Sequence, residues 1–413
     1  MKKKILFVIN TLGRAGAETA LITLLKKLPE NEYDISLYVL CGQGELVREL
    51  PTYVHLLNRH FCGESVLSKK GKFLLLKTVL KKCFCHGALF LNLPYLFLNR
   101  KNTPLFLILF KSAFCDGGFG QREKLLWRIV SDGSERFDTH FDLAVSYIEG
   151  GSAYYVHDHV SAAKKAAFIH VDYVQAGYTR RLDKDCYMDF DRIFAVSDET
   201  AGVFAGVYPE CQQKLSVFHN LIDTETIRQK ALLPAEKAMH EGIRLLTVGR
   251  LTPQKGFDCA VYALKLLLEK QYPVYWYIIG EGPEYGRLTQ LARSLHVEDH
   301  FIFLGMQTNP YPYFKMTDFY IHATRFEGKS IAIQEAQVLG CAIAASDCSG
   351  NREQIVSGVD GLLCPFSPEG IANAVEYLIE HPQTAESFGR AAAQKACHFE
   401  NDIHMIRDLL YSP

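Results

Sequence analysis

The sequence has no excess of charge of either sign. It carries 45 Lys and Arg residues against 46 Asp and Glu residues, for a formal net charge of −1. A protein that binds nucleic acid over a broad surface would carry a basic excess, so that class is disfavoured. No apolar run reaches the length of about 18 residues that a membrane-spanning helix needs. Glycine (30) and proline (15) are near average usage, which argues against disordered and collagen-like chains.

The 12 cysteines are scattered along the chain, without the regular spacing of a disulfide scaffold. Cys83, Cys85 and His86 form a tight cluster, but no second pair follows at zinc-finger spacing. We therefore expect reduced thiols and no bound metal. The chain starts with a basic head and a short apolar run that leads into a glycine turn, which predicts a first strand and not a signal peptide.

Short apolar runs alternate with helix-like segments in both halves of the chain. Near-continuous apolar strands between helices indicate parallel sheets covered on both faces, so we predict an α/β protein with two doubly wound domains. The domains span 1–225 and 240–395, with the boundary in the polar stretch 223–242, and residues 396–413 form a helix that crosses back to the first domain. The predicted strands are 35–40, 142–147, 165–170, 192–197, 215–219, 243–249, 274–280, 301–305, 319–323, 342–346 and 361–364, and helices are predicted at 257–269, 284–294 and 330–339.

Residues 66–130 depart from this pattern. They hold twelve basic and two acidic residues among Leu- and Phe-rich runs, so the segment carries +10 and the rest of the chain −11. Basic residues interleaved with large apolar side chains are typical of a segment that lies on an anionic membrane surface. Helices that pack on the first domain with a solvated basic face would have the same composition, and both interpretations stay open. An RNA-binding patch is a third, less favoured interpretation.

Four segments fit the rule that doubly wound domains bind ligands at the carboxyl ends of strands, near helix N-termini. In the first, Gly13–Glu18, glycines let the backbone approach a ligand closely. In the second, Gly249–Gly256, Arg250 and Lys255 can neutralise a diphosphate, although a solvated loop can also carry two cations.

The third segment, Gly280–Gly286, fails the dinucleotide fingerprint because Tyr285 stands where the last glycine is needed. A nicotinamide enzyme therefore has little support, and we interpret the segment as a tight turn that lines a nucleotide pocket or has a structural role. In the fourth segment Ser330 is predicted to cap a helix whose N-terminus attracts phosphate. Glu327 and Glu335 suit sugar hydroxyls, which donate hydrogen bonds to carboxylates.

Taken together, these motifs resemble glycosyltransferase family 4. The motifs are Gly249-Arg250 with Lys255-Gly256, then Gly280-Glu281-Gly282-Pro283, then Glu327 and Glu335 with seven residues between them. The resemblance covers about 190–395 strongly. It is thinner before that, resting on the first glycine turn and Phe168-Ile169-His170, and Ala15 replaces a glycine of the family's usual turn. It implies the GT-B architecture, two facing Rossmann-like domains with the active site in the cleft.

The resemblance also implies roles for single residues. Arg250 and Lys255, beside Gly249 and Gly280, would bind the donor diphosphate. Glu327 would hold the donor sugar and phosphate, Glu335 the ribose hydroxyls, Gly16 would approach the diphosphate, and His170 would lie beside the sugar. The backbone that assists Glu327 runs through Gly328, Lys329, Ser330 and Ile331.

The expected activity is retaining, metal-independent transfer from a nucleotide-diphosphate sugar to a saccharide or lipid-linked saccharide in cell-surface polysaccharide synthesis. The donor is expected to be a UDP-hexose or UDP-N-acetylhexosamine, with no cofactor and no nucleic-acid partner. The enzyme is placed in the cytoplasm, at the inner face of the plasma membrane if 66–130 contacts lipid. A nucleotide-sugar epimerase and a non-catalytic nucleotide-sugar-binding subunit are the alternatives. His157-Asp158-His159 can be a metal pair, but a solvent-exposed loop is the favoured interpretation.

Overall fold

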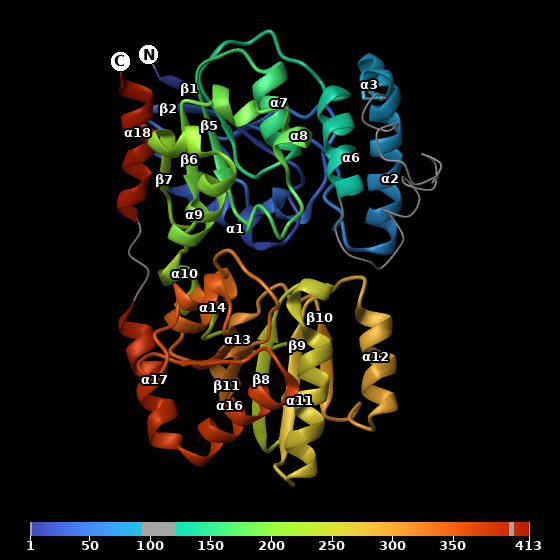
Figure 1. Cartoon of the computed structure of the whole chain (residues 1–413), viewed down its shortest axis with the longest axis vertical. Coiled ribbons are helices and arrows are strands. Elements are labelled where there is room, and N and C mark those ends of the chain that lie inside the picture. The colour runs from blue at the N-terminus through green and yellow to red at the C-terminus, as the bar shows by residue number, and fades with distance from the viewer. Residues whose placement is uncertain (1, 93–120, 396–399, 413) are drawn as a thin grey trace. The chain divides into compact units, whose positions relative to one another are not determined.

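The computed structural model describes residues 2–92, 121–395 and 400–412 of the chain. These residues form two compact units, Met1–Leu221 with Phe399–Pro413, and Ile222–His398 (Figure 1). The division falls at the start of the polar stretch 223–242 and not inside it. The reason is that α10 (Thr224–Lys230) packs on α13 (Tyr311–Met316) and α14 (Ile331–Val338) of the second unit.

The first unit is built on a parallel sheet. Seven strands of its described residues lie in the order β3-β2-β1-β4-β5-β6-β7. Hydrophobic residues of β1 and β4 and the second half of β5, Ala166–Ile169, are buried, which agrees with a sheet covered on both faces. The strands are β1 (Lys3–Ile9), β2 (Tyr33–Val39), β3 (His55–Leu56), β4 (Phe141–Ser146), β5 (Ala162–Ile169), β6 (Arg192–Ala195) and β7 (Leu215–Val217).

Helices link these strands and cover the sheet. Among the described residues, the α-helices of the first unit are α1 (Gly16–Lys27), α2 (Lys69–Phe84), α3 (Ala88–Leu91), α6 (Gln121–Asp132), α7 (Gly151–His159), α8 (Arg180–Asp183), α9 (Asp198–Val207) and α18 (His404–Tyr411). The short 3-10 helices are η1 (Glu45–Glu49), η2 (Cys85–Gly87), η3 (Cys186–Asp189), η4 (Pro209–Lys214) and η6 (Glu400–Ile403). The final helix α18 buries Ile406, Leu409 and Leu410 within the first unit, and the Asp402 carboxylate pairs with His219 Nδ1 at 2.8 Å.

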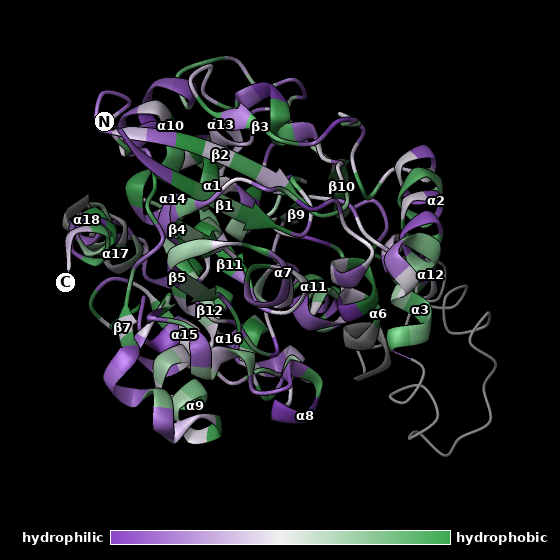
Figure 2. Cartoon of the chain, turned by 90° about the horizontal axis from the view of Figure 1, so that it is seen from above, coloured by the Kyte–Doolittle hydropathy of each residue, from purple (hydrophilic) through white to green (hydrophobic). Residues whose placement is uncertain are grey.

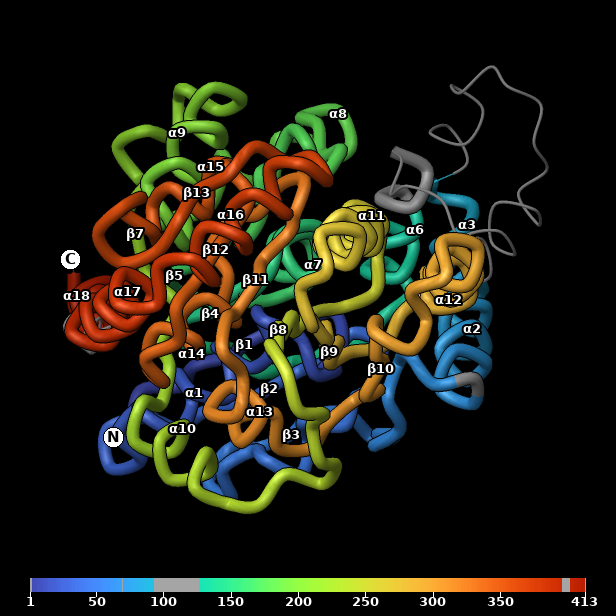
Figure 3. Tube along the Cα trace, turned by 90° about the horizontal axis from the view of Figure 1, so that it is seen from below, coloured from blue at the N-terminus to red at the C-terminus, as the bar shows by residue number. Residues whose placement is uncertain are grey.

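The second unit repeats the plan with six described strands in the order β10-β9-β8-β11-β12-β13, all parallel (Figure 3). Side chains alternate across the sheet. Leu245 and Trp276 face one hydrophobic cluster, while Leu246 and Tyr277 face another on the opposite side. The strands are β8 (Ile243–Val248), β9 (Val274–Ile279), β10 (Phe301–Gly305), β11 (Phe319–His322), β12 (Ala342–Ser346) and β13 (Leu362–Cys364).

Local sequence explains why the helices of this unit begin and bury the faces they do. Gly256 takes a positive φ of 61° directly before α11, whose buried side chains repeat at helical spacing. The Ser367 hydroxyl accepts from Gly370 N and caps α16, with a proline in its first turn. The remaining elements are η5 (Pro253–Lys255), α11 (Phe257–Glu269), α12 (Tyr285–Ser294), α15 (Ser349–Arg352), α16 (Pro368–Glu380) and α17 (Pro382–Gln394).

The prediction of two doubly wound α/β domains with parallel sheets is confirmed. The predicted strands 301–305 and 342–346 and helix 257–269 coincide with β10, β12 and α11, and most other bounds differ by one to three residues. The two-residue strand β3 was not predicted, because so short a segment shows no periodicity. No helix in the described part of the chain is both long and apolar enough to cross a bilayer.

Candidate active site

Three of the four predicted ligand-binding segments lie at the carboxyl edge of the second sheet. Gly249 follows β8 directly, Gly280 follows β9, and the segment that leads to Glu327 follows β11. The strand order reverses between β8 and β11, and such a switch point is where doubly wound sheets bind ligands. The fold therefore gathers these segments where a phosphate-containing ligand is expected.

Two of these loops touch backbone to backbone, and this contact requires glycine. Gly280 has a φ of 144°, and a Cβ atom there would come 2.0 Å from Gly249 O. A Cβ atom on Gly282 would come 2.3 Å from Leu251 O, and Leu251 N donates to Glu281 O at 2.9 Å. The glycines thus hold the loops after β8 and β9 at a fixed, close spacing.

Lys255 and Glu327 form an ion pair at this edge. Their loops are joined by hydrogen bonds from Arg325 N to Gln254 O at 2.8 Å and from Gln254 Nε2 to Phe326 O at 3.0 Å. The Lys255 ammonium contacts Glu327 Oε2, and the two side chains are only 17% and 13% exposed. The sequence predicted both residues in the site, and the structure brings them into direct contact.

Glu327 stays ionised although it is buried. Burial alone would raise its pKa, but the Lys255 ammonium and a hydrogen bond from His322 outweigh that effect and hold the pKa of Glu327 at about 2. His322, the last residue of β11, has Nε2 3.4 Å from Glu327 Oε2 and Nδ1 3.2 Å from the Tyr320 hydroxyl. Neither His322 nor Tyr320 stands in a motif, so sequence reasoning missed both.

Ser330 occupies the N-cap position of α14, but its hydroxyl makes no capping hydrogen bond, so the predicted side-chain cap is wrong. Gln354 holds this backbone instead. Ser330 N donates to Gln354 Oε1 at 2.7 Å, and Gln354 Nε2 donates to Ser330 O at 2.9 Å. Because the side chain of Gln354 fixes Ser330 on both sides, the start of α14 at Ile331 is positioned without a local cap.

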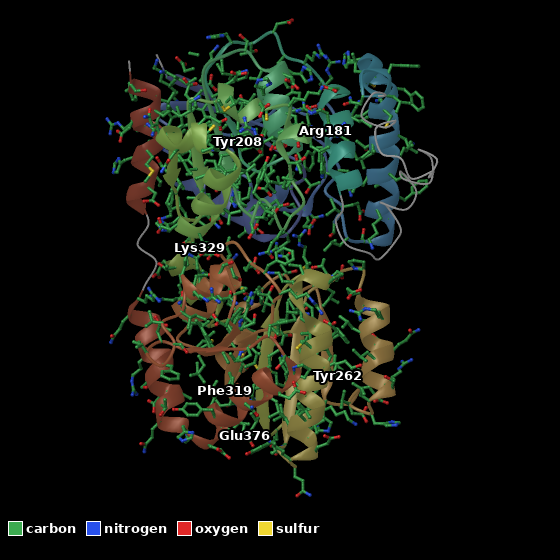
Figure 4. The ribbon with its side chains drawn as sticks, viewed as in Figure 1. Arg181, Tyr208, Tyr262, Phe319, Lys329 and Glu376 are labelled. Atoms are coloured by element: carbon green, nitrogen blue, oxygen red, sulfur yellow. The ribbon has the colours of Figure 1, made fainter. Side chains whose placement is uncertain are left out.

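The loop before α14 is packed closely. A Cβ atom on Gly350, in α15, would come 1.9 Å from Gly328 O, so the two backbones are in contact. Lys329 follows in this loop, next to the amino end of α14 (Figure 4). The free N–H groups of a helix's first turn attract anions, so this end of α14 can face a phosphate.

Glu335 lies one turn into α14 and is 9% exposed. The Tyr311 hydroxyl, at the start of α13, donates to Glu335 Oε1 at 2.9 Å. Arg250 is exposed, and within the described ranges it forms no ion pair. A carboxylate held by a tyrosine and an uncommitted guanidinium are therefore both available at the carboxyl edge of this sheet.

The predicted residues of the first unit lie at the carboxyl ends of β1 and β5. Gly16 is the exposed first residue of α1, and His170 follows β5. Burial lowers the pKa of His170 to about 4, so its ring is neutral near physiological pH. His170 N donates to Glu149 Oε2 at 2.9 Å, while His170 Nε2 is buried without a hydrogen-bond partner in the described structure.

His157, Asp158 and His159 form the last turn of α7 and not a loop, so the loop interpretation is wrong. They are held by ion pairs, because His159 Nε2 lies 3.0 Å from Asp132 Oδ1 and Arg128 Nη1 lies 2.8 Å from Asp158 Oδ2. Atoms of Asp132, Asp158 and His159 lie within 4.8 Å of one another, as in a metal site. The Arg128 guanidinium already pairs with Asp158 and offsets one of the two carboxylate charges, which disfavours a bound cation.

Comparison with known proteins agrees with this geometry. Residues 226–395 match the family model described as "Glycosyl transferases group 1". The chain is 24% identical over 411 residues to the N-acetylgalactosamine-N,N'-diacetylbacillosaminyl-diphospho-undecaprenol 4-alpha-N-acetylgalactosaminyltransferase of Campylobacter jejuni, covering 99% of this chain and 98% of the relative. It is also 33% identical over 158 residues to an uncharacterized glycosyltransferase of Haemophilus influenzae, covering 37% of this chain and 44% of that protein.

Solved structures share the fold. The crystal structure of Anabaena HepE in complex with UDP superposes with a TM-score of 0.64 at 16% identity, covering 100% of both chains. A structure of S. aureus TarM in a complex that includes UDP gives a TM-score of 0.67 at 12% identity, covering 99% of this chain and 100% of that one. The chain thus has the GT-B fold with two parallel sheets, and residues 226–395, most of its second unit, are similar to the group 1 glycosyltransferases.

Proposed function

We propose that the protein is a retaining, metal-independent glycosyltransferase that moves a hexose or N-acetylhexosamine from a UDP-sugar to a saccharide or lipid-linked saccharide. The observation that carries the proposal is the buried ion pair of Lys255, at the end of η5, and Glu327, in the loop that leads to α14, at the carboxyl edge of the second sheet. Similar folds in complex with UDP and UDP-glucose support the donor. The diphospho-undecaprenol in the C. jejuni relative's name supports a lipid-linked acceptor.

The chemistry follows from where charge develops. As the bond between the anomeric carbon and the UDP oxygen breaks, negative charge grows on the leaving diphosphate. Arg250, Lys255 and the N-terminus of α14 supply fixed positive charge there, so the protein's own groups stabilise the leaving group. The acceptor oxygen then bonds to the same face of the anomeric carbon, which retains the configuration, and its proton passes to the departing phosphate oxygen.

His170 is better suited to contact the donor sugar than to act as a general base. Its pKa of about 4 makes the ring a weak proton acceptor at neutral pH. A buried Nε2 atom without a protein partner is instead ready for a hydrogen bond with a sugar hydroxyl. We therefore assign His170 to positioning the donor sugar.

Transfer assays test the proposal directly. A thermal-shift screen of UDP-, GDP- and ADP-sugars identifies the donor, because a ligand that binds only the folded state raises stability. With that donor, Lys255→Ala and Glu335→Ala should abolish most transfer, while Lys265→Ala, on α11 outside the site, should not. Unchanged transfer in the first two variants would show the site assignment to be wrong. Conversion of the donor without acceptor would indicate an epimerase instead.

We also propose that α2 contacts an anionic membrane surface at the cytoplasmic face of the membrane. Val79 and Cys83 on one side of α2 are buried in the first unit, while Phe73 and Phe84 are 63% and 75% exposed. At about 100° per residue these two phenylalanines lie on one face of the helix. Figure 2 shows hydrophobic and hydrophilic residues mixed along α2.

The same face of α2 is basic. The exposed Lys70, Lys77 and Lys81 fall within about 80° of Phe73 around the helix, and α2 contains no acidic residue. Lys70 pairs with Glu64 at 2.6 Å, which leaves Lys77 and Lys81 as the main cationic groups of this face. Exposed phenylalanines between lysines fit an anionic bilayer, which binds both kinds of side chain.

Vesicle binding tests this contact. The protein should bind phosphatidylcholine vesicles that contain phosphatidylglycerol, more tightly at low salt, and the double variant Phe73→Ser/Phe84→Ser should bind more weakly. Leu232→Ser is the matched control, since Leu232 is 74% exposed in the second unit. Equal binding of the double variant and the control would rule out this face.

A further inference from the structure

Two side chains of the second sheet, Tyr320 and His322, connect in sequence to Glu327 of the ion pair. Tyr320 and His322 are both on β11, and both are fully or almost fully buried. The Tyr320 hydroxyl lies 3.2 Å from His322 Nδ1, and His322 Nε2 lies 3.4 Å from Glu327 Oε2. The glycosyltransferase motifs include neither Tyr320 nor His322.

The partners of the ring determine its tautomer. Burial raises the pKa of Tyr320 well above its usual value, so the hydroxyl keeps its proton and can donate it to Nδ1. Burial lowers the pKa of His322, so the imidazole is neutral and carries one proton. With Nδ1 accepting from Tyr320, that proton lies on Nε2 and points to the Glu327 carboxylate.

Both donors to Glu327 use the same oxygen. Lys255 and His322 contact Oε2, while Oε1 has no hydrogen-bond partner within the described residues. A carboxylate that is held through one oxygen cannot rotate freely, and its second oxygen keeps a fixed direction. Such an oxygen can accept from a sugar hydroxyl at a defined place.

We propose that His322 is a positioning residue, which with Tyr320 orients Glu327 so that Oε1 receives a hydroxyl of the donor sugar. The inference rests on the proposed role of Glu327 in holding that sugar. Lys255 cannot do this alone, because a diphosphate in the site competes with Glu327 for its ammonium group. His322 is neutral and buried behind the carboxylate, so it remains a partner of Glu327 when Lys255 turns to phosphate.

Substitutions at His322 test this role. His322→Leu should lower kcat roughly ten- to a hundredfold, the effect of one hydrogen bond to a charged group, while the Kd for UDP stays within about twofold. His322→Gln keeps an N–H near the Nε2 position and should recover most of the lost kcat. Tyr320→Phe should give a smaller loss, because the ring remains but its tautomer is no longer fixed.

Nitrogen-15 NMR of histidine provides a readout that needs no sugar donor. The wild-type spectrum should contain a neutral ring protonated at Nε2 that is absent in His322→Gln and altered in Tyr320→Phe. A ring protonated at Nδ1, an equal loss of kcat in the Leu and Gln variants, or weaker UDP binding in place of slower transfer would each overturn the proposal. Failure of the wild type to use any UDP-sugar would instead refute the proposed function, whichever tautomer the spectrum shows.

Discussion

Replacing Glu327 by glutamine should strengthen the binding of UDP while it slows sugar transfer. The Glu327 carboxylate is ionised, with a pKa of about 2, and it contacts the ammonium group that the proposed function assigns to the diphosphate. Without UDP the Glu327 carboxylate therefore pairs with the Lys255 ammonium group, and in the complex with UDP it repels the phosphate. Glu327→Gln keeps the shape of the side chain and removes its charge.

The size of this effect follows from Coulomb's law. A phosphate oxygen that contacts Lys255 would lie about 6 Å from the Glu327 carboxylate, since one ammonium group separates them. At an effective dielectric constant of about 20 to 40, two like charges at that separation repel by about 1–3 kcal/mol. Some of this repulsion is screened, so we expect UDP to bind roughly five- to thirtyfold more tightly to the variant.

Isothermal titration calorimetry with UDP at fixed ionic strength measures the change. Lys255→Met should weaken binding, and in the Lys255→Met background Glu327→Gln should have a smaller effect, because the two residues are coupled. Transfer should still fall in Glu327→Gln, since the donor sugar loses its carboxylate partner. Weaker UDP binding in Glu327→Gln than in the wild type would refute the electrostatic reasoning.

Three further predictions concern stability and can be checked by denaturant unfolding of the full chain. Gly280→Ala should destabilise the second unit by about 2–5 kcal/mol, from backbone strain and the clash with Gly249 O, whereas Gly286→Ala, with open space around it in α12, should be neutral or stabilising. Burial raises the pKa of Asp183 to about 7, although hydrogen bonds from Tyr154 and Tyr208 and the nearby Arg128 lower it. The contribution of Asp183 to the free energy of unfolding is therefore present below about pH 4 and is lost as the pH rises through 7. Asp183→Asn should therefore flatten the fall in stability between about pH 4 and 7, and an unchanged slope would contradict this. The pKa of Glu327 is lowered, so its effect on stability runs in the opposite direction: its contribution is present above about pH 4.5 and is lost as the pH falls toward 2. Glu327→Gln should remove this acid-dependent contribution to the free energy of unfolding.

Local patterns predicted the architecture because each strand and helix is encoded by neighbouring residues. The helix at 257–269 coincides with α11, since Gly256 permits the turn before it and apolar residues repeat along one face. The three C-terminal segments meet at one edge because parallel strands all end there, a property of the fold class and not of any single residue.

The remaining features of the site depend on contacts between distant segments, which spacing does not encode. Gln354 replaces the predicted Ser330 cap from 24 residues away, and Tyr311 reaches Glu335 from another helix. The sequence pattern predicts His322 only as part of a strand, although its polar side chain in an otherwise apolar run is the one signal that indicates a role in the site. Hydrogen bonds between such distant residues can be identified only in the folded structure, which brings their segments together.

The return of α18 to the first unit has a consequence for how the chain folds during synthesis. The second unit is continuous from Ile222 to His398, so it can fold as soon as it has left the ribosome. The first unit begins earlier but stays incomplete, because Ile406, Leu409, Leu410 and Asp402, which pairs with His219, are made only after the whole second unit. The unit that starts first is thus completed after the second unit, and a chain that lacks α18 would hold a complete second unit and a first unit with an uncovered apolar surface.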